Sequence, residues 1–509
     1  MKSKTRKIFK ILGWGLIVFV YLFAYIIICV NSWVKKTFNA SIDEILFTFT
    51  NPLKGSNNHT LYNALEFCIP RILLFILLSV AVVFLLRYIG KKYYLKVETK
   101  KCTKTIKLSK ILSNIAKISC VIFLSFTLIQ TERQYLIIDY IRNQMSQTTI
   151  YEQYYVNPND ANIRLATSDG EKKNLIYIYL ESMENTYASK DVGGSQNANY
   201  IPNLTTLANE NISFSNSNKL GGFYNTNGST WTMGAIMATS SGLPYSFPIG
   251  LNSMDRREKF ASGITNLGDI LEQQGYNQLF MCGSDAEFGG RALYFEQHGN
   301  YDIFDLYTAR EENYIADDYH VWWGYEDEYL YKAAKDKITE LSNNDEPFNL
   351  TMLTVDTHFL EGYVCELCQN QYGDACANIV SCADRQVYAF IEWCKTQEFF
   401  KDTVIVISGD HLRMDNCLVE GLTKNQRTIY NCFINSQISE NINMKNRIFT
   451  PMDMFPSTLS ALGYEWDGDR LGIGTNLFSN SQTLAEELGF EYLNSELSKR
   501  SNYYIDNFT

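Results

Sequence analysis

The sequence is poor in histidine and has no excess of basic residues, and each shortage limits what the chain can do. Only five histidines occur among 509 residues, so a histidine placed beside a carboxylate stands out. Acidic side chains outnumber basic ones by 55 to 45, whereas nucleic-acid binding requires a basic surface. We therefore expect no nucleic-acid partner. No internal repeat or low-complexity tract occurs, so a repeat architecture is not expected either.

The basic residues that are present crowd into the first hundred or so positions, beside long apolar runs. About 20 apolar residues span the hydrocarbon of a membrane, which predicts transmembrane helices at about 11–31, 69–89 and 111–130. The first run follows a basic start, as a signal peptide does, but it is too long and lacks a small-x-small cleavage site. Asn114 and Lys117 interrupt the third run, whose alternative is a buried helix of a soluble domain.

The distribution of lysine predicts the orientation in the membrane. Lysines are dense between the second and third runs, around residues 90–110, whereas only Lys35, Lys36 and Lys54 lie between the first two. Positive loops stay in the cytoplasm, which places everything after about residue 132 outside. We expect a multi-pass protein of the cytoplasmic membrane, with a membrane region at 1–131, a juxtamembrane helix and linker at 132–172, and an extracytoplasmic domain at 173–509.

Four of the twelve cysteines cluster in one short polar stretch, at Cys365, Cys368, Cys376 and Cys382. Export would favour disulfides there, and four cysteines allow three complete pairings. The Cys-x-x-Cys at 365–368 is also compatible with a zinc pair or a redox site. No His-x-x-x-His partner lies nearby, which favours disulfides and leaves their connectivity open.

The outer domain shows the alternation of an α/β fold. Short apolar runs end in a polar residue at 174–181, 278–285, 348–356 and 403–410, and helix-like stretches separate them. Near-continuous apolar strands indicate a parallel sheet covered on both faces. Ligands bind at the carboxyl ends of such strands. We therefore expect one edge of the sheet to carry Glu181, Asp285, Asp356–His358 and Asp410–His411.

Asp410 and His411 directly follow an apolar strand, Thr403-Val-Ile-Val-Ile-Ser-Gly. A carboxylate and an imidazole side by side suit zinc or manganese. The alternative is a helix-capping Asp beside a solvent-facing His. Glu181 is the second candidate ligand, and its alternative is a Glu in the first turn of a helix, where the helix dipole favours it.

The segment Gly228-Ser-Thr-Trp-Thr-Met-Gly-Ala-Ile-Met-Ala-Thr-Ser-Ser-Gly-Leu-Pro244 reads as a polar loop that enters a small-residue helix. Gly242 and Pro244 predict where that helix ends. A hydroxyl at the start of a helix lies where backbone N–H groups attract a phosphate, and a nearby metal would help to ionise it. The alternative is that Ser229 or Thr230 only caps the helix.

Together these segments resemble the alkaline phosphatase/sulfatase superfamily. Within it the chain is similar to the phosphoglycerol transferases that decorate periplasmic glucans and, more distantly, to the lipoteichoic acid synthases. The resemblance covers about residues 170–470 and implies a central mixed sheet flanked by helices. The matching segments, in chain order, are 174–182, Trp231-Thr232 to Gly242-Leu-Pro244, Cys282-Gly-Ser-Asp-Ala-Glu-Phe-Gly-Gly-Arg291, Thr354-Val-Asp-Thr-His358 and 404–411.

The resemblance implies one divalent ion held by Glu181, Asp410 and His411, with the nucleophile as a further ligand. Manganese is favoured, and zinc or magnesium are alternatives. The implied nucleophile is a threonine. Thr232 has the expected spacing to the helix end at Gly242, and Thr230 is the alternative.

The resemblance also implies how the substrate is bound. Arg291 would hold the transferred phosphate, because a guanidinium matches phosphate oxygens in a bidentate way. His358 would act as general acid and base, since imidazole titrates near neutral pH. Asp285 and Phe288 are further pocket candidates.

The implied reaction moves phosphoglycerol from phosphatidylglycerol, through a phospho-threonine, to a hydroxyl of an extracytoplasmic glycan. Alternatives are a phosphoethanolamine transferase, a sulfatase or a phosphodiesterase on the same site, or a catalytically inactive sensor of envelope glycans. Sulfatases need a Cys or Ser followed by Pro-x-Arg, which Thr232-Met-Gly-Ala lacks. Gly283 stands where the lipoteichoic acid synthases suggest a histidine, which favours the glucan branch.

Overall fold

The computed structural model describes residues 2–38, 42, 45–46, 59–99, 102–247, 259–438 and 440–509. The chain divides into two compact units, each described by itself below. The first unit comprises residues 1–39 and 58–139, and the second comprises residues 40–57 and 140–509.

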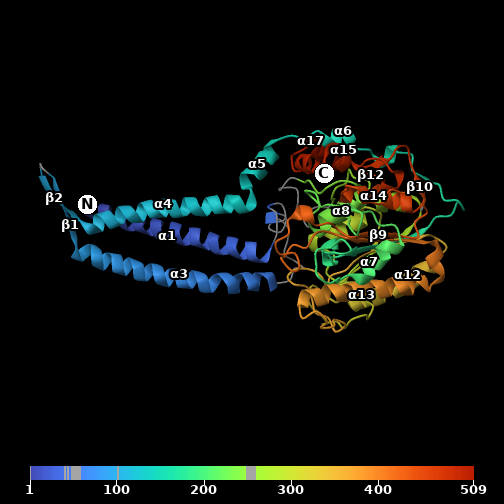
Figure 1. The fold of residues 1–509 in the computed structure, drawn as a ribbon, viewed down its shortest axis with the longest axis horizontal. Coiled ribbons are helices and arrows are strands. Elements are labelled where there is room, and N and C mark those ends of the chain that lie inside the picture. Colours follow the sequence, from blue (N-terminus) through green and yellow to red (C-terminus); the bar gives the residue numbers. More distant parts are fainter. Residues whose placement is uncertain are drawn as a thin grey trace. The chain divides into compact units, whose positions relative to one another are not determined.

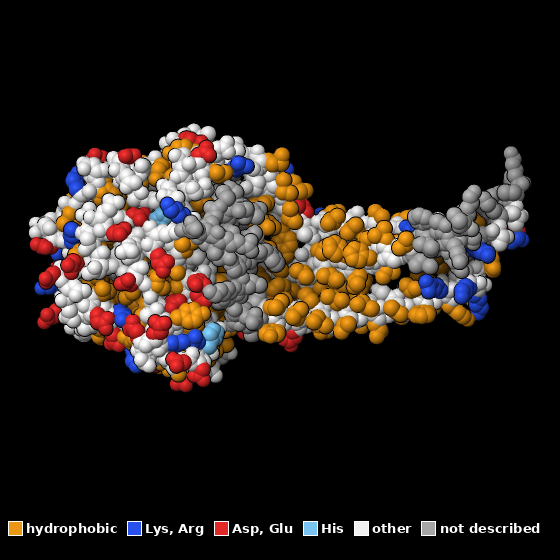
Figure 2. Space-filling model, turned by 180° about the vertical axis from the view of Figure 1, so that it is seen from behind, with side chains coloured by type: hydrophobic (Ala, Val, Ile, Leu, Met, Phe, Trp, Pro, Cys, Tyr) orange, Lys and Arg blue, Asp and Glu red, His pale blue; other side chains and the backbone are white. Residues whose placement is uncertain are grey.

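The first unit contains three long helices that run side by side (Figure 1). They are α1 (Lys2–Thr37), α3 (His59–Lys92) and α4 (Leu108–Tyr135). Among the described residues, three stretches are long and apolar enough to cross a membrane, at Leu12–Thr37, Thr60–Lys92 and Leu108–Tyr135. Hydrophobic side chains cover their visible face (Figure 2). The three predicted spans lie within these helices, and the unit anchors the chain to a membrane.

The lysine-rich connection between α3 and α4 is a β-hairpin rather than the loop that the sequence suggested. Strands β1 (Tyr94–Thr99) and β2 (Cys102–Lys107) pair antiparallel. Lys and Arg side chains gather at this end of the helices (Figure 2). Alternating Lys and Thr in β2 suits a two-sided polar ribbon, which explains why its strand pattern was not recognised among the charges.

The second unit is built on a six-stranded mixed sheet with the order β6-β5-β7-β4-β8-β9. Every neighbouring pair is parallel except β8 and β9, which are antiparallel. This confirms the central mixed sheet and the four apolar strands predicted above. The short strands β6 and β9 were not predicted. The bounds are β4 (Asn174–Leu180), β5 (Asn277–Cys282), β6 (Asp302–Phe304), β7 (Phe348–Leu353), β8 (Thr403–Gly409) and β9 (Asn431–Ile434).

Helices cover both faces of the sheet, because the strands are apolar on both sides. Tyr177 and Tyr179 of β4 point into a core with α8 and α14, whereas Ile176 and Ile178 point into a second core with α7, α12 and α13. The helices are α7 (Pro202–Glu210), α8 (Thr232–Ser241), α12 (Asp327–Ser342), α13 (Ala375–Lys395) and α14 (Pro451–Ala461).

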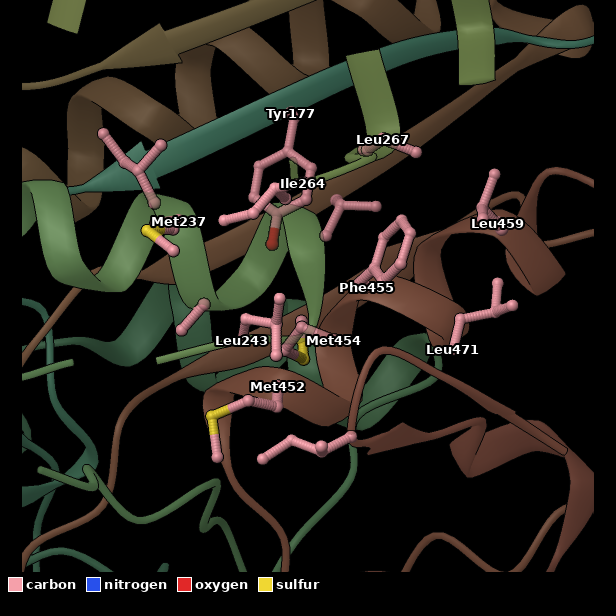
Figure 3. Close-up of a cluster of buried hydrophobic side chains, with 14 of the residues drawn as sticks. Tyr177, Met237, Leu243, Ile264, Leu267, Met452, Met454, Phe455, Leu459 and Leu471 are labelled. Carbon is pink, nitrogen blue, oxygen red and sulfur yellow. The ribbon is translucent and has the colours of Figure 1, made fainter. Parts of the chain in front are cut away.

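The first core is the one that supports α8. Tyr177 of β4 and Met237 of α8 lie in one cluster with Phe455 of α14 (Figure 3). α8 is buried along nearly all of its length, which its small residues permit. Its start is therefore held rigidly against the sheet.

Shorter elements complete the described chain. They are α5 (Ile137–Met145), α6 (Ile150–Tyr154), β3 (Arg164–Leu165), α9 (Leu267–Gln273), α10 (Arg291–Gln297), α11 (Leu306–Glu311), β10 (Tyr464–Glu465), β11 (Arg470–Leu471), β12 (Gly474–Thr475), α15 (Leu484–Leu488), α16 (Phe490–Leu497) and α17 (Asn502–Phe508). The first of them, α5, contains the boundary between the two units at residues 139 and 140. Ile150 and Tyr151 are fully buried in the first core, so this part of the predicted linker packs with the α/β unit.

Candidate active site

Two neighbouring strands bring the predicted metal ligands together. β4 and β8 pair in parallel with Leu180 opposite Gly409, so Glu181 and Asp410 leave the sheet side by side. Glu181, Asp410 and His411 are all buried, and one ligand atom from each lies within 4.8 Å of the others. His411 Nε2 is 3.5 Å from Glu181 Oε1 and 3.3 Å from Asp410 Oδ2. The edge predicted from the strand ends therefore holds a three-residue cluster.

Thr232 reaches this cluster from the first position of α8. Its hydroxyl donates to Glu181 Oε2 at 3.3 Å and lies 3.3 Å from His411 Nε2. The side chain is half-buried, so it faces both the cluster and solvent. The residue that caps α8 is Trp231, through its backbone, so neither Ser229 nor Thr230 is the cap. The Ser229 hydroxyl instead bonds to the backbone of Thr226.

The cluster has the properties of a site for a divalent cation. His411 Nδ1 lies 2.9 Å from the Leu412 carbonyl oxygen, so Nδ1 carries the proton and the lone pair of Nε2 points at two carboxylates. Among the residues that the structure describes, buried Asp410 Oδ2 has no hydrogen-bond partner. A cation would satisfy both atoms, because carboxylate oxygen and imidazole nitrogen are its ordinary ligands.

The electrostatics of the cluster point the same way. Burial, and then the charge of Glu181, raise the pKa of Asp410 to about 7. Burial acts to raise the pKa of Glu181, but the attraction of the His358 and His411 rings in their protonated forms, together with the hydrogen bond from Ser182, outweighs it, and the pKa falls below its usual value. Two carboxylates held this close repel each other unless a positive charge lies between them.

Hydroxyl groups and backbone amides fix the two carboxylates. Ser182 Oγ donates to Glu181 Oε1 at 2.6 Å, and the backbone N–H of Ser182 donates to Asp410 Oδ1 at 2.7 Å. Thr354 Oγ1 accepts from the backbone N–H of Glu181, and Thr357 Oγ1 donates to its carbonyl oxygen. The end of β7 therefore orients the end of β4, which keeps the ligand atoms in place.

His358 follows β7 and is half-buried against aromatic rings. Its ring centroid lies 4.5 Å from that of Trp323 and 4.4 Å from that of Phe359. Nδ1 is 2.8 Å from the Phe359 carbonyl oxygen, which leaves Nε2 as the basic nitrogen. Burial lowers the pKa of His358 below its ordinary value, although the charge of Glu181 opposes this shift. The side chain therefore carries a neutral imidazole near neutral pH.

Arg291 is connected to His358 through the rings of Phe288 and Trp323. Its Nη2 donates to Ser284 Oγ at 3.1 Å and to the Asp285 carbonyl oxygen at 2.7 Å. The guanidinium also lies over the Phe288 ring, which in turn packs against Trp323, the ring that touches His358. Its charge contributes to the lowered pKa of His358, so the two groups are close enough to interact.

Both carboxylate oxygens of Asp285 accept hydrogen bonds from other groups of the protein. Oδ1 accepts from the backbone N–H of Glu287 and Oδ2 accepts from the Tyr307 hydroxyl. Gly283 precedes it, and a side chain there would place Cβ 2.6 Å from the Tyr325 carbonyl oxygen. This close backbone approach explains why glycine stands where a histidine was expected from the more distant resemblance.

Two buried ion pairs beside the site were not recognised in the sequence. Arg427 binds both carboxylate oxygens of Glu184, and Arg413 binds Asp415 while donating to the Thr357 carbonyl oxygen. Arg413 and Asp415 follow the Asp410–His411 pair directly, and this spacing is the only signal that could have suggested them. They brace the loops that carry the candidate ligands.

The cysteine-rich segment forms one disulfide with a partner outside the predicted set. Cys376 is joined to Cys417, with Cα atoms 6.4 Å apart. Cys417 lies far along the chain, so the cluster of four in the sequence did not reveal it. Cys365, Cys368 and Cys382 keep free thiols that face one another.

Comparison with known proteins matches the α/β unit to a protein family and to two curated relatives. A family model described as sulfatase matches residues 173–464. Phosphoglycerol transferase I of Xanthomonas euvesicatoria pv. vesicatoria is 33% identical over 276 residues, covering 53% of this chain and 38% of that protein. Phosphoglycerol transferase I of Salmonella choleraesuis is 33% identical over 334 residues, covering 63% and 41%. The chain spans about two fifths of the length of these curated relatives.

A crystal structure of an alkaline phosphatase superfamily protein from Vibrio parahaemolyticus is also similar. It aligns with a TM-score of 0.48 and 25% identity, covering 64% of this chain and 74% of that one.

Proposed function

Because the chain belongs to the sulfatase family, we propose that it is a membrane-anchored, metal-dependent phosphoglycerol transferase. The donor is phosphatidylglycerol, and the acceptor is a hydroxyl of a glycan outside the cytoplasm. The names of its curated relatives, phosphoglycerol transferase I, support the transferred group. The three apolar helices support a donor that lies in the bilayer.

The observation that carries the proposal is the position of the Thr232 hydroxyl. It lies 3.3 Å from both Glu181 Oε2 and His411 Nε2, at the N-terminus of a buried helix. Backbone N–H groups at that position favour a negatively charged phosphate. Among the described residues, Thr230 has no hydrogen bond to this cluster. Thr232 is therefore the proposed nucleophile.

The reaction has two steps, and Thr232 takes part in both. Its Oγ1 loses its proton and bonds to phosphorus while the bond from phosphorus to the diacylglycerol oxygen breaks, and that oxygen takes up one proton and leaves as an alcohol. An acceptor hydroxyl then bonds to phosphorus, and the bond to Oγ1 breaks. His358, neutral through its lowered pKa, takes the proton of the acceptor hydroxyl, and Oγ1 regains one proton as it leaves, so the step neither gains nor loses protons.

Glu181, Asp410 and His411 would hold the divalent ion, with Thr232 Oγ1 as a further ligand. The ion, proposed to be manganese, would lower the pKa of the hydroxyl and neutralise charge on the phosphate. Arg291 would hold the phosphate oxygens in a bidentate way, and Phe288 with Asp285 would line the pocket beside it.

Mass spectrometry of the full chain in detergent tests the nucleophile. After incubation with manganese and phosphatidylglycerol, we expect a phosphoglycerol adduct on the wild type and on Thr230→Ala. We expect none on Thr232→Ala, while Thr232→Ser keeps a hydroxyl and regains part of the adduct. Loss of the adduct in Thr230→Ala alone would overturn the assignment.

Donor lipids labelled in the head group test the transferred group. Label should pass to the protein from phosphatidylglycerol and not from phosphatidylethanolamine. Transfer from phosphatidylethanolamine alone would instead identify a phosphoethanolamine transferase. A folded, metal-loaded chain that takes label from neither lipid would mean that the site is not a transferase of this kind.

A further inference from the structure

Three thiols lie together where the loop after His358 meets α13, and none of them belongs to the Glu181–Asp410–His411 cluster. Cys365 Sγ lies 3.6 Å from Cys368 Sγ and 3.7 Å from Cys382 Sγ. All three sulfur atoms lie within 4.8 Å of one another. Cys365 and Cys382 are buried, and Cys368 is half-buried. No step of the proposed transfer reaction uses them.

The spacing of the sulfur atoms matches the edge of a metal–thiolate tetrahedron. Zinc binds thiolate sulfur at about 2.3 Å, and tetrahedral angles then place two sulfur ligands about 3.8 Å apart. The two measured separations are 3.6 and 3.7 Å. The Cys365-Glu-Leu-Cys368 spacing is also common in structural zinc sites.

A disulfide accounts for the cluster less completely. One disulfide can join only two of the three sulfur atoms. The third thiol would then touch that disulfide and would promote thiol–disulfide exchange. The same segment does contain a disulfide, between Cys376 and Cys417. A metal ion, by contrast, uses all three sulfur atoms of the cluster.

Gln386 supplies a group at the fourth corner. Its Nε2 lies 3.6 Å from Cys382 Sγ and 3.9 Å from Cys365 Sγ. Its Oε1 is buried and has no hydrogen-bond partner among the described residues. A 180° rotation of the amide exchanges the two atoms and turns the unpartnered oxygen toward the sulfurs. Sulfur and oxygen ligands of one zinc ion are about 3.6 Å apart, which is close to these separations.

We propose that Cys365, Cys368 and Cys382 form a thiolate site for a zinc ion, with Gln386 at the fourth position. The ion ties the loop after His358 to α13. That loop is also fixed by the Glu361 N–H, which donates to Asp415 Oδ2 at 2.8 Å, and the Cys376–Cys417 disulfide holds the first turn of α13, where the loop ends. The zinc site is thus a third anchor for the segment that follows a candidate catalytic histidine.

Metal analysis of the full chain in detergent tests the site. The metal is first removed with a chelator, and the thiols are then alkylated. A site that held a metal should yield alkylated Cys365, Cys368 and Cys382, because none of the three is in a disulfide. Cobalt replacing zinc should give thiolate-to-cobalt charge-transfer absorption, which the oxygen and nitrogen ligands of the other cluster cannot produce. Cys365→Ser and Cys382→Ser should lose this absorption and the bound zinc.

Cys394→Ser is the matched control, because Cys394 is a buried thiol of the same helix outside the cluster. It should keep both signals. In the wild type, chelation should also increase proteolysis between residues 359 and 374, a readout that needs no variant to fold. A disulfide between any two of the three cysteines would overturn the proposal. Three free thiols without bound metal, or cobalt absorption unchanged in Cys365→Ser, would do so equally.

Discussion

At the scale of single residues, Arg291 is the clearest test of how the phosphate is held. Its Nε donates to the Phe288 carbonyl oxygen and its Nη2 to Ser284 and Asp285, which fixes the direction of the two N–H groups on Nη1. Removing one such donor from a transition state costs about 10²- to 10³-fold in rate. We expect Arg291→Ala to lose that much in kcat with vesicles of phosphatidylglycerol.

Arg291→Lys should recover only a small part, because an ammonium group cannot bind in a bidentate way. Arg164→Lys, at a half-exposed arginine outside the site, is the control and should keep full activity. Equal activity of Arg291→Lys and the wild type would show that only the charge matters.

His358 gives the transfer reaction a predicted pH dependence. Burial lowers the pKa of His358 from 6.5, and a base acts only when it is unprotonated. The value of kcat/KM should therefore rise with pH below 6.5 and level off above it. His358→Gln should remove this rise of kcat/KM with pH, which is the acidic limb of the pH profile. It should also slow the reaction about 10²- to 10⁴-fold.

His320→Gln provides a matched control, since His320 is exposed. It should keep both the rate and the limb. A limb that persists in His358→Gln would assign the titration to another group.

The residues of the site differ in how far the sequence predicted them. Glu181, Asp410 and His411 end apolar strands, so the edge where they meet follows from the strand pattern. The resemblance favoured Thr232 over Thr230, and the contacts of the Thr232 hydroxyl with Glu181 and His411 support that proposal. Cys417 and Arg427 could not be found, because their partners are distant in the chain and only tertiary packing brings them together.

At the scale of elements, α7 depends on a buried carboxylate from another helix. Asp384 of α13 accepts from the backbone N–H groups of Asn203 and Leu204, in the first turn of α7. Leaving these donors unsatisfied costs about 1–3 kcal/mol. Asp384→Ala should lower the free energy of unfolding by this amount, and thermal unfolding of the full chain would measure it.

The same carboxylate predicts a pH effect on stability. Burial raises the pKa of Asp384 from 3.8 to about 6, so the folded state binds this proton more tightly than the unfolded state does. The contribution of the protonated Asp384 carboxyl to the free energy of unfolding is complete below pH 3.8 and is lost as pH rises through about 6. The difference in stability between the wild type and Asp384→Asn should therefore change across that window. A constant difference would contradict the raised pKa.

The long apolar strands were predictable, and the short strands and the lysine-rich hairpin were not. β4, β5, β7 and β8 are continuous apolar runs, and the end of α8 at Gly242 follows from a left-handed residue there. β6 has three residues and β9 has four, too few to show a periodicity. The β1–β2 hairpin was hidden because its lysines read as a charged loop.

At the scale of the whole molecule, the orientation of the chain is a prediction from its charges. The hairpin and the ends of α3 and α4 beside it are rich in lysine, and such segments stay in the cytoplasm. An alkaline phosphatase reporter, active only outside the cytoplasm, should be inactive when fused after residue 107 and active after residue 140. The opposite pattern would place the α/β unit in the cytoplasm and exclude an extracytoplasmic acceptor.

The anchor also makes a prediction about the donor, because the chain passes from the first unit into the second for the last time within a few residues of the end of α4. α4 ends at Tyr135, its C-cap Leu136 adopts a left-handed conformation, and the second unit resumes at residue 140. A chain of residues 137–509 contains all of the second unit except residues 40–57, and it should fold and keep its activity on a short-chain, soluble phosphatidylglycerol. On vesicles it should lose about 10²-fold or more in kcat/KM, because tethering raises the effective concentration of a bilayer donor. Equal loss on both donors, with an unchanged melting temperature, would mean that the helices contribute to the site itself rather than only holding the enzyme at the membrane.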